Sequence, residues 1–146
     1  DENVFSIGFF GKTANSLAGK DIKLSDRLFL PSSKLRGFES GKVGPKDGAD
    51  FIGGNYATSI NIATSLSQIL PNSQNTNFSV FFDAANVWGI DYSSSLSDDS
   101  KIRSSIGIAL DYLTPIGPLS FSLSEPITKG KNDITESFRF NLGTTF

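Results

Sequence analysis

The last nine residues of the chain alternate between two sets of side chains. The even positions hold Phe138, Phe140, Leu142, Thr144 and Phe146, and the odd positions hold Arg139, Asn141, Gly143 and Thr145. A period of two places each set on its own face of an extended strand, whereas an amphipathic helix requires a period near 3.6. The same alternation recurs in earlier segments, and helical periodicity is hard to find. We therefore predict an all-β fold.

Six strands are expected, and the connections between them alternate in length. The strands are placed at about residues 4–14, 54–70, 77–88, 102–113, 118–126 and 136–146. Short turns follow the second and fourth of these strands, at 71–77 and 114–118, and longer loops follow the others, at about 15–53, 89–101 and 127–135. Short turns on one side and long loops on the other are typical of outer-membrane barrels.

The polar faces of these strands favour a membrane barrel over a soluble sandwich, although both folds have one apolar face. Small Ser, Asn, Gly and Ala residues outnumber Lys and Glu there, although soluble surface strands usually carry charge against edge pairing. In a barrel the apolar face contacts lipid and the small polar face encloses a water-filled lumen. We predict an antiparallel up-and-down transmembrane β-barrel. Six strands are too few to close a barrel, so further strands are expected before Asp1. A soluble β-sandwich binding module is the alternative.

Composition excludes several classes of chemistry. The chain has no Cys, His or Met, so catalytic thiols, imidazole bases and Cys/His metal sites are excluded. Its 13 basic and 15 acidic residues argue against nucleic-acid binding. No G-x-S-x-G elbow occurs, and no apolar run approaches the roughly 18–20 residues of a transmembrane helix. We expect no enzymatic activity, no cofactor and no metal.

Four motifs occur in order along nearly the whole chain. They are Leu35-Arg36-Gly37-Phe38, Gly53-Gly54-Asn55, the strand Phe81 to Trp88 that contains Asp83, and Pro115-Ile116-Gly117-Pro118-Leu119 followed by the closing strand. Together they resemble the [VIL]-R-G-F, G-G-N, F-x-D-x-G-x-V and P-[LI]-G-P-[LI] motifs of the Omp85 superfamily, and within it the barrel-assembly factors. Ala85 stands where the family pattern has Gly.

The resemblance implies a sixteen-stranded barrel in the bacterial outer membrane, preceded by POTRA domains. This chain would hold the last six strands, without the POTRA domains and the first ten strands. The implied function is insertion and folding of β-barrel proteins through a weak seam between the first and last strands, without covalent catalysis. The implied partners are membrane lipid, nascent β-barrel clients and accessory assembly lipoproteins. A polypeptide secretion pore of the same superfamily is the alternative.

The resemblance also implies that the loop at about 15–53 folds into the barrel and carries the R-G-F motif. On the parity of its strand Asp83 faces the lumen, and a guanidinium suits bidentate pairing with a carboxylate, so we expect a salt bridge from Arg36. The alternative is an exposed Arg36 in a mobile loop. A second family carboxylate that faces this Arg would fall at Ser67, so the pair in this chain is expected to be simpler or weaker.

The closing strand is expected to form the seam through Phe138, Phe140, Leu142, Gly143 and Phe146. The backbone N–H and C=O groups along its edge are available for hydrogen bonds to another strand, and a terminal aromatic residue suits the membrane interface. Gly143 either lets the strand bend inward or makes room for a bulky neighbour. The charges on polar faces are expected to have structural or solvation roles, and they are Arg103 with Asp111 and Glu125 with Arg139.

Overall fold

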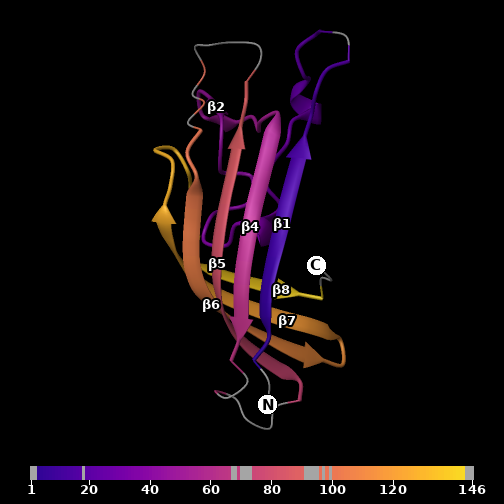
Figure 1. Ribbon diagram of the computed structural model, residues 1–146, viewed down its shortest axis with the longest axis vertical. Helices are drawn as coiled ribbons and strands as arrows, with labels where there is room; N and C mark the ends of the chain where they lie inside the picture. The colour runs from indigo at the N-terminus through magenta and orange to yellow at the C-terminus, as the bar shows by residue number, and fades with distance from the viewer. Residues whose placement is uncertain are drawn as a thin grey trace.

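The computed structural model describes residues 3–17, 19–66, 69, 74–90, 96, 98 and 100–143, and six of its strands form one antiparallel sheet (Figure 1). In sheet order the strands are β1 (Phe5–Thr13), β4 (Tyr56–Ser65), β5 (Thr76–Trp88), β6 (Arg103–Thr114), β7 (Gly117–Thr128) and β8 (Phe138–Leu142). Each strand pairs with its neighbour in the chain order of these six, which is an up-and-down arrangement. The predicted all-β antiparallel class is confirmed.

The connection between β1 and β4 contains short elements that the sequence did not reveal. They are the 3₁₀ helices η1 (Leu24–Asp26) and η2 (Ser32–Lys34), and the two-residue strands β2 (Lys46–Asp47) and β3 (Asp50–Phe51), which pair with each other. Elements of two or three residues are too short to produce a readable periodicity. Within the described ranges, no helix has the length and apolar content needed to span a bilayer.

One face of the sheet carries continuous rows of apolar side chains. The cross-strand register places Ile62 beside Phe82 and Ile108 beside Leu123, and Leu123 is in turn beside Phe138. These side chains point outward: Phe138 is 53% exposed, and no second sheet covers this face within the part of the chain that is described. The face is that of a membrane barrel, and the soluble β-sandwich alternative is wrong.

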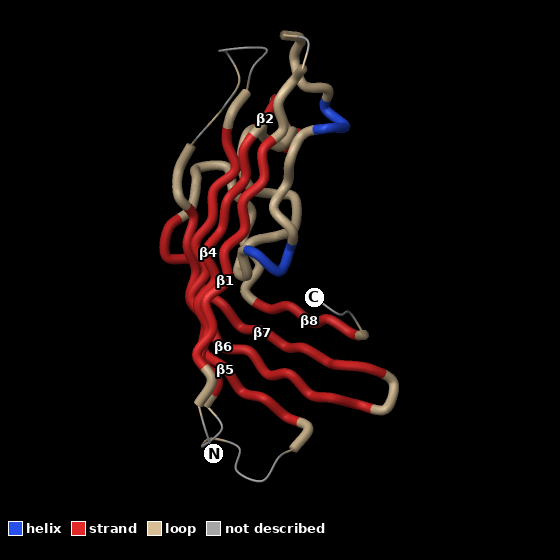
Figure 2. The backbone as a smooth tube through the Cα atoms, turned by 45° about the vertical axis from the view of Figure 1, so that its right-hand side comes forward, coloured by secondary structure: helices blue, strands red, loops and turns tan. Residues whose placement is uncertain are grey.

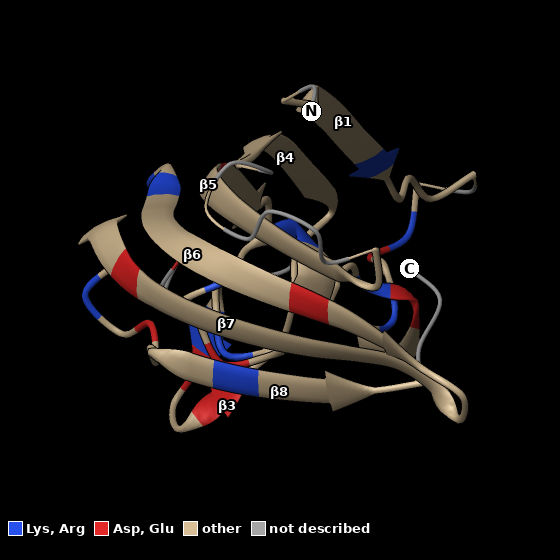
Figure 3. Cartoon of the chain, turned by 90° about the horizontal axis from the view of Figure 1, so that it is seen from below, with Lys and Arg blue, Asp and Glu red and all other residues tan. Residues whose placement is uncertain are grey.

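The strands themselves carry little charge, and most charged residues lie in the connections (Figure 3). Glu125 is an exception that contradicts the expected shared polar face with Arg139. It has the parity of Phe121 and Leu123 on β7 and pairs with Ile106, so it lies on the outer face, whereas Arg139 lies on the inner one. Strand parity is fixed by the period of two, and Glu125 is odd-numbered in a strand whose odd positions face outward.

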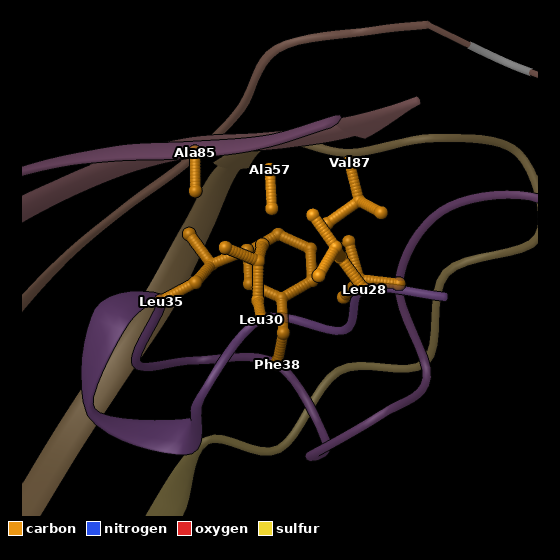
Figure 4. Close-up of a cluster of buried hydrophobic side chains, with 8 residues drawn as sticks. Leu28, Leu30, Leu35, Phe38, Ala57, Ala85 and Val87 are labelled. Carbon is orange, nitrogen blue, oxygen red and sulfur yellow. The ribbon is translucent and has the colours of Figure 1, made fainter. Parts of the chain in front are cut away.

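The sheet is bent, and the long connection lies against its inner side (Figure 2). Apolar residues of this connection pack on small and branched residues of β4 and β5 (Figure 4). The buried cluster consists of Leu28, Leu30, Leu35, Phe38, Val43, Ala57, Ala85 and Val87, with Phe10 and Ala14 packed against it. We call residues 14–55 the inner loop.

The cluster changes the expected character of the inner face. A water-filled lumen was predicted for the small-residue face, but Ala57 and Val87 are fully buried under the inner loop. Small side chains leave space above a strand, and the leucines of the inner loop fill it, because removing their apolar area from water is favourable. Over β4 and β5 the inner face is therefore partly a dry packing surface.

Candidate functional site: the anchored inner loop

The site is built around the carboxylate of Asp83, which is fully buried in the middle of β5. Asp83 Oδ2 accepts hydrogen bonds from Arg36 Nε at 2.8 Å and from the Arg36 backbone N–H at 3.0 Å. Asp83 Oδ1 accepts from Arg36 Nη2 at 2.8 Å and from Asn61 Nδ2 at 2.8 Å. Four donors, two of them from one guanidinium, satisfy the oxygens of the buried carboxylate.

Arg36 is held on its other sides by β5 and β6. Its guanidinium carbon lies 3.5 Å from the centroid of the Phe81 ring, which is a cation–π contact. Its backbone carbonyl accepts a hydrogen bond from Ser105 Oγ. The Phe81 ring fits because a Cβ at position 107 would lie only 2.5 Å from its Cζ, and Gly107 has none. The arginine side chain is 22% exposed, so the alternative of a solvated loop arginine does not describe this site.

Asn61 is the residue of β4 that completes the network, and sequence reasoning missed it. Its Nδ2 donates to the carboxylate and also to the Lys34 carbonyl at 3.0 Å. The register pairs Asn61 directly with Asp83, so its inward parity and its position opposite a conspicuous carboxylate were the available signals. The family carboxylate position assigned to Ser67 lies outside the described residues.

The rest of the R-G-F motif fits tightly beneath the sheet. Gly37 has a φ of +93°, and a Cβ there would lie 3.1 Å from Ser105 Cβ and 3.2 Å from Ser124 Oγ. Phe38 is 1% exposed in the buried cluster, beside Leu35. A left-handed backbone against a packed surface accepts glycine and penalises any other residue.

The G-G-N motif fastens the middle of the inner loop to its last residues, just before β4. Gly54 and Leu28 exchange backbone hydrogen bonds of 2.8 and 2.9 Å, and a Cβ at Gly54 would collide with the backbone of Trp88. Gly53 has a φ of +71°, and Asn55 Oδ1 accepts from Arg27 Nη1 at 3.4 Å. The motif thus joins two segments of the inner loop through backbone hydrogen bonds.

A second buried ion pair fastens the connection between β7 and β8. Arg103 Nε lies 2.8 Å from Asp133 Oδ2, and both side chains are 1% exposed. Asp133 also accepts from the backbone N–H groups of Gly130 and Gly44, and Arg103 also donates to Asn86 Oδ1 at 2.7 Å. Sequence reasoning assigned Arg103 a general structural role but did not find Asp133, because the partner lies 30 residues away in a loop.

The predicted seam residues divide between the outer face of β8 and its end. Phe138, Phe140 and Leu142 point outward and are about half exposed. Gly143 ends the strand with a φ of +70° and donates its N–H to the Pro118 carbonyl at 2.8 Å. Among the described residues, nothing lies within 4 Å of the position that a Cβ at Gly143 would take, so none of them is a bulky neighbour that this glycine accommodates. Phe146 lies outside the described residues.

The arrangement anchors the inner loop to the sheet. No cluster of three or more His, Cys, Asp or Glu side chains suited to a metal ion occurs among the described residues. Arg36 of the inner loop is bonded to Asp83 of β5, and Asp133 of the β7–β8 connection is bonded to Arg103 of β6, so the two buried carboxylates hold loop segments against strands. The geometry fixes the inner loop in one position on the inner face.

An open antiparallel sheet with an apolar outer face and a loop fastened to its inner face defines part of an outer-membrane β-barrel. A family model described as the Omp85 superfamily domain matches residues 1–146, so the chain belongs to the Omp85 superfamily of outer-membrane proteins. The predicted family and the outer-membrane location are confirmed.

Named relatives and a solved structure agree with this family. The chain is 30% identical over 141 residues to an outer membrane protein assembly factor BamA from Neisseria meningitidis and 25% identical over 132 residues to one from Neorickettsia risticii. These matches cover 77% and 88% of the chain but only 17% and 18% of the relatives. A crystal structure of Haemophilus ducreyi BamA lacking POTRA domains 1–3 matches with a TM-score of 0.83 and 33% identity, over 94% of this chain and 30% of that one.

Proposed function

We propose that the chain forms the closing part of a barrel that inserts and folds other β-barrel proteins in the outer membrane. The observation that carries the proposal is the short pairing of β8 with β7. Within the described residues, which end at Gly143, β8 pairs with β7 over five residues, whereas the other neighbouring strands pair over nine to eleven. Its other edge has no partner strand among the described residues. The likeness to named assembly factors supports the same function.

The backbone of β8 supports a templating role without covalent catalysis. The Ser137 carbonyl and the Gly143 N–H are both bonded to β7, so odd residues direct their backbone groups to that strand. In an antiparallel ladder the even residues Phe138, Phe140 and Leu142 then direct their N–H and C=O groups to the free edge. An incoming client strand would add to these groups by β-augmentation, which requires no catalytic residue.

The height of the outer face supports a role for the lipid. Within the described residues, the apolar row on β8 runs from Phe138 to Leu142. Five residues of strand span roughly 17 Å, so this described part of the row is shorter than the hydrocarbon thickness of about 30 Å. Such a mismatch thins the adjacent bilayer and would lower the barrier to insertion beside β8. Lipid and nascent β-barrel clients are the proposed partners, together with accessory assembly lipoproteins.

The test uses the full-length protein in lipid vesicles with a urea-unfolded β-barrel client, whose folding is followed by its resistance to SDS without heating. Leu142→Pro removes one free-edge N–H and leaves the β7 pairing intact, since proline is tolerated at an outward-facing edge position. We expect this variant to fold the client about tenfold more slowly than wild type, the effect of losing about one net hydrogen bond. The control Leu142→Ala loses the same side chain but keeps the N–H, and it should behave like wild type.

Two results would contradict the proposal. Equal client folding by Leu142→Pro and Leu142→Ala would show that the β8 edge is not the template. Passage of unfolded client into the vesicle interior without insertion would support a secretion pore instead.

A further inference from the structure

Arg139 is the inward-facing residue of β8 between two outward phenylalanines, and its guanidinium contacts the inner loop. Its Nη1 donates to the Ser32 carbonyl at 2.5 Å, and its Nη2 donates to the Phe38 carbonyl at 2.6 Å. Nη2 also lies 3.1 Å from Glu136 Oε2. The arginine side chain is 12% exposed, whereas Glu136 is 44% exposed. The specific acceptors are therefore the two loop carbonyls, because an ion pair to an exposed carboxylate contributes little.

The two carbonyls flank the segment that carries the R-G-F motif. Ser32 precedes Arg36 by four residues, and Phe38 follows it by two. The middle of the segment is bonded to Asp83 on β5 and to Ser105 on β6, as described above. One short segment thus connects the middle of the sheet to its closing strand, and Arg139 makes the connection at the β8 end.

The backbone leading into β8 also pairs with the inner loop. Glu39 N–H donates to the Ile134 carbonyl at 2.9 Å, and Glu136 N–H donates to the Gly37 carbonyl at 3.0 Å. Phe38 and Thr135 form an isolated antiparallel bridge. The start of β8 is consequently held from two sides, by a short pairing with β7 and by the inner loop.

We infer that Arg139 is a positioning residue that couples the seating of Arg36 on Asp83 to the attachment of β8. If the segment leaves Asp83, the carbonyls of Ser32 and Phe38 move and Arg139 loses its acceptors. If β8 moves, the same bonds pull on the segment. Coupling of this kind acts equally in both directions. The inference adds to the proposed function a link between the inner loop and the templating strand, and its relevance to client folding rests on that function.

The guanidinium is suited to this role in a way that an ammonium is not. Its planar fork reaches two carbonyls at once with fixed geometry, whereas a lysine head is a single point donor on a flexible stem. Arg139→Lys therefore keeps the charge and most of the side-chain length, but it removes the simultaneous hydrogen bonds to both sides of the motif. This substitution separates positioning from simple solvation of the inner face.

The test measures backbone amide exchange of the full-length protein in lipid nanodiscs, at β8 and at the R-G-F segment. Arg139→Lys should raise exchange at β8 by about tenfold, the effect of losing one net hydrogen bond to a charged group. Asn141→Ala is the matched control, because Asn141 shares the inward face of β8 and makes no hydrogen bond to the inner loop among the described residues. Unchanged exchange in β4 and β5 verifies that each variant is folded.

The coupling between Asp83 and β8 is measured by introducing Asp83→Asn into the wild type and into the Arg139→Lys variant and comparing amide exchange at β8. With Arg139 present, Asp83→Asn should raise exchange at β8 as well as at the R-G-F segment. With Lys at position 139 the additional effect on β8 should be at least several-fold smaller. Equal responses of β8 in the two backgrounds, or an Arg139→Lys variant that matches Asn141→Ala, would overturn the inference. Because exchange requires no client, this outcome is independent of the Leu142→Pro folding test.

Discussion

Removal of the Asp83 carboxylate is expected to release the inner loop from the sheet. The carboxylate accepts four hydrogen bonds, three of them from Arg36, and it is fully buried. Breaking a buried ion pair on one side costs about 3–5 kcal/mol, because the remaining charge loses its partner. The guanidinium keeps some contact with water, so we place Asp83→Ala near the lower end, at about 3 kcal/mol.

The charge swap of the pair gives a sharper expectation. An arginine at position 83 and an aspartate at position 36 restore the attraction between side chains. The backbone N–H of residue 36 and the amide of Asn61 remain donors, however, and they would then face a guanidinium that accepts nothing. The swap should therefore recover only part of the loss, with a coupling free energy of about 2 kcal/mol in a double-mutant cycle.

The loop position can be followed through a single thiol, because the chain contains no cysteine. Val43→Cys places a buried reporter in the loop cluster, in a full-length protein whose cysteines elsewhere, if any, are replaced. The rate of alkylation then reports the fraction of molecules with the loop released. Asp83→Ala should raise that rate more than 100-fold. In the charge-swap cycle, the alkylation rate of the double variant should be roughly 30-fold lower than the two single changes predict together. The control Asp111→Asn alters an inward carboxylate that bonds Ser120 instead, and it should change the rate little. If the effects of Asp83→Arg and Arg36→Asp on the alkylation rate were simply additive in the double variant, the pairing of these two residues would be refuted.

Three further substitutions test other parts of the site. Gly37→Ala combines a positive φ with a Cβ only 3.1 Å from a neighbouring side chain, so it should destabilise the attached position of the inner loop by about 2–3 kcal/mol. Gly41→Ala is the control, because Gly41 also has a positive φ but a Cβ there would meet no described atom within 4 Å, and it should cost about 1 kcal/mol. The alkylation rate of the Val43→Cys reporter compares the two variants. Phe121→Lys puts a charge on the outer face and should cost about 2–4 kcal/mol of barrel stability in urea titrations in lipid, whereas Ser120→Lys, one residue away on the inner face, should cost far less. Asn61→Asp replaces a donor with an acceptor beside a buried carboxylate and should loosen the loop at least as much as Asn61→Ala does, as measured by alkylation.

The strands could be read from the sequence because their side chains obey a period of two on a sheet with one apolar face. That rule predicts the inward orientation of Asp83 from the sequence, and Phe121 lies on the outer face as the same parity requires. It also places Glu125 outward, and assigning that residue by its charge instead of its parity was the error. Parity therefore carries more information than polarity at any single position of such a strand.

The partners of the inner loop could not be read in the same way. Asp133 pairs with Arg103, and Arg139 bonds the Ser32 carbonyl across 107 residues, yet nothing periodic links these positions. Their encounter depends on the path of a loop that has no repeating side-chain pattern. A motif match identifies Arg36 as a candidate site residue, but the path of the loop backbone determines which strand its side chain contacts.

The small residues of the inner face explain why that path is possible. Ala57, Ala85 and Ser105 leave a shallow surface on three adjacent strands, and Gly107 leaves the space that the Phe81 ring occupies beneath Arg36. Larger side chains at these positions would fill the same space and displace the inner loop from its buried carboxylate. The alternation of small inward and large outward residues therefore does two things with one pattern. It gives lipid an apolar wall, and it gives loops from the same chain a fitted surface on which two ion pairs with buried carboxylates can form.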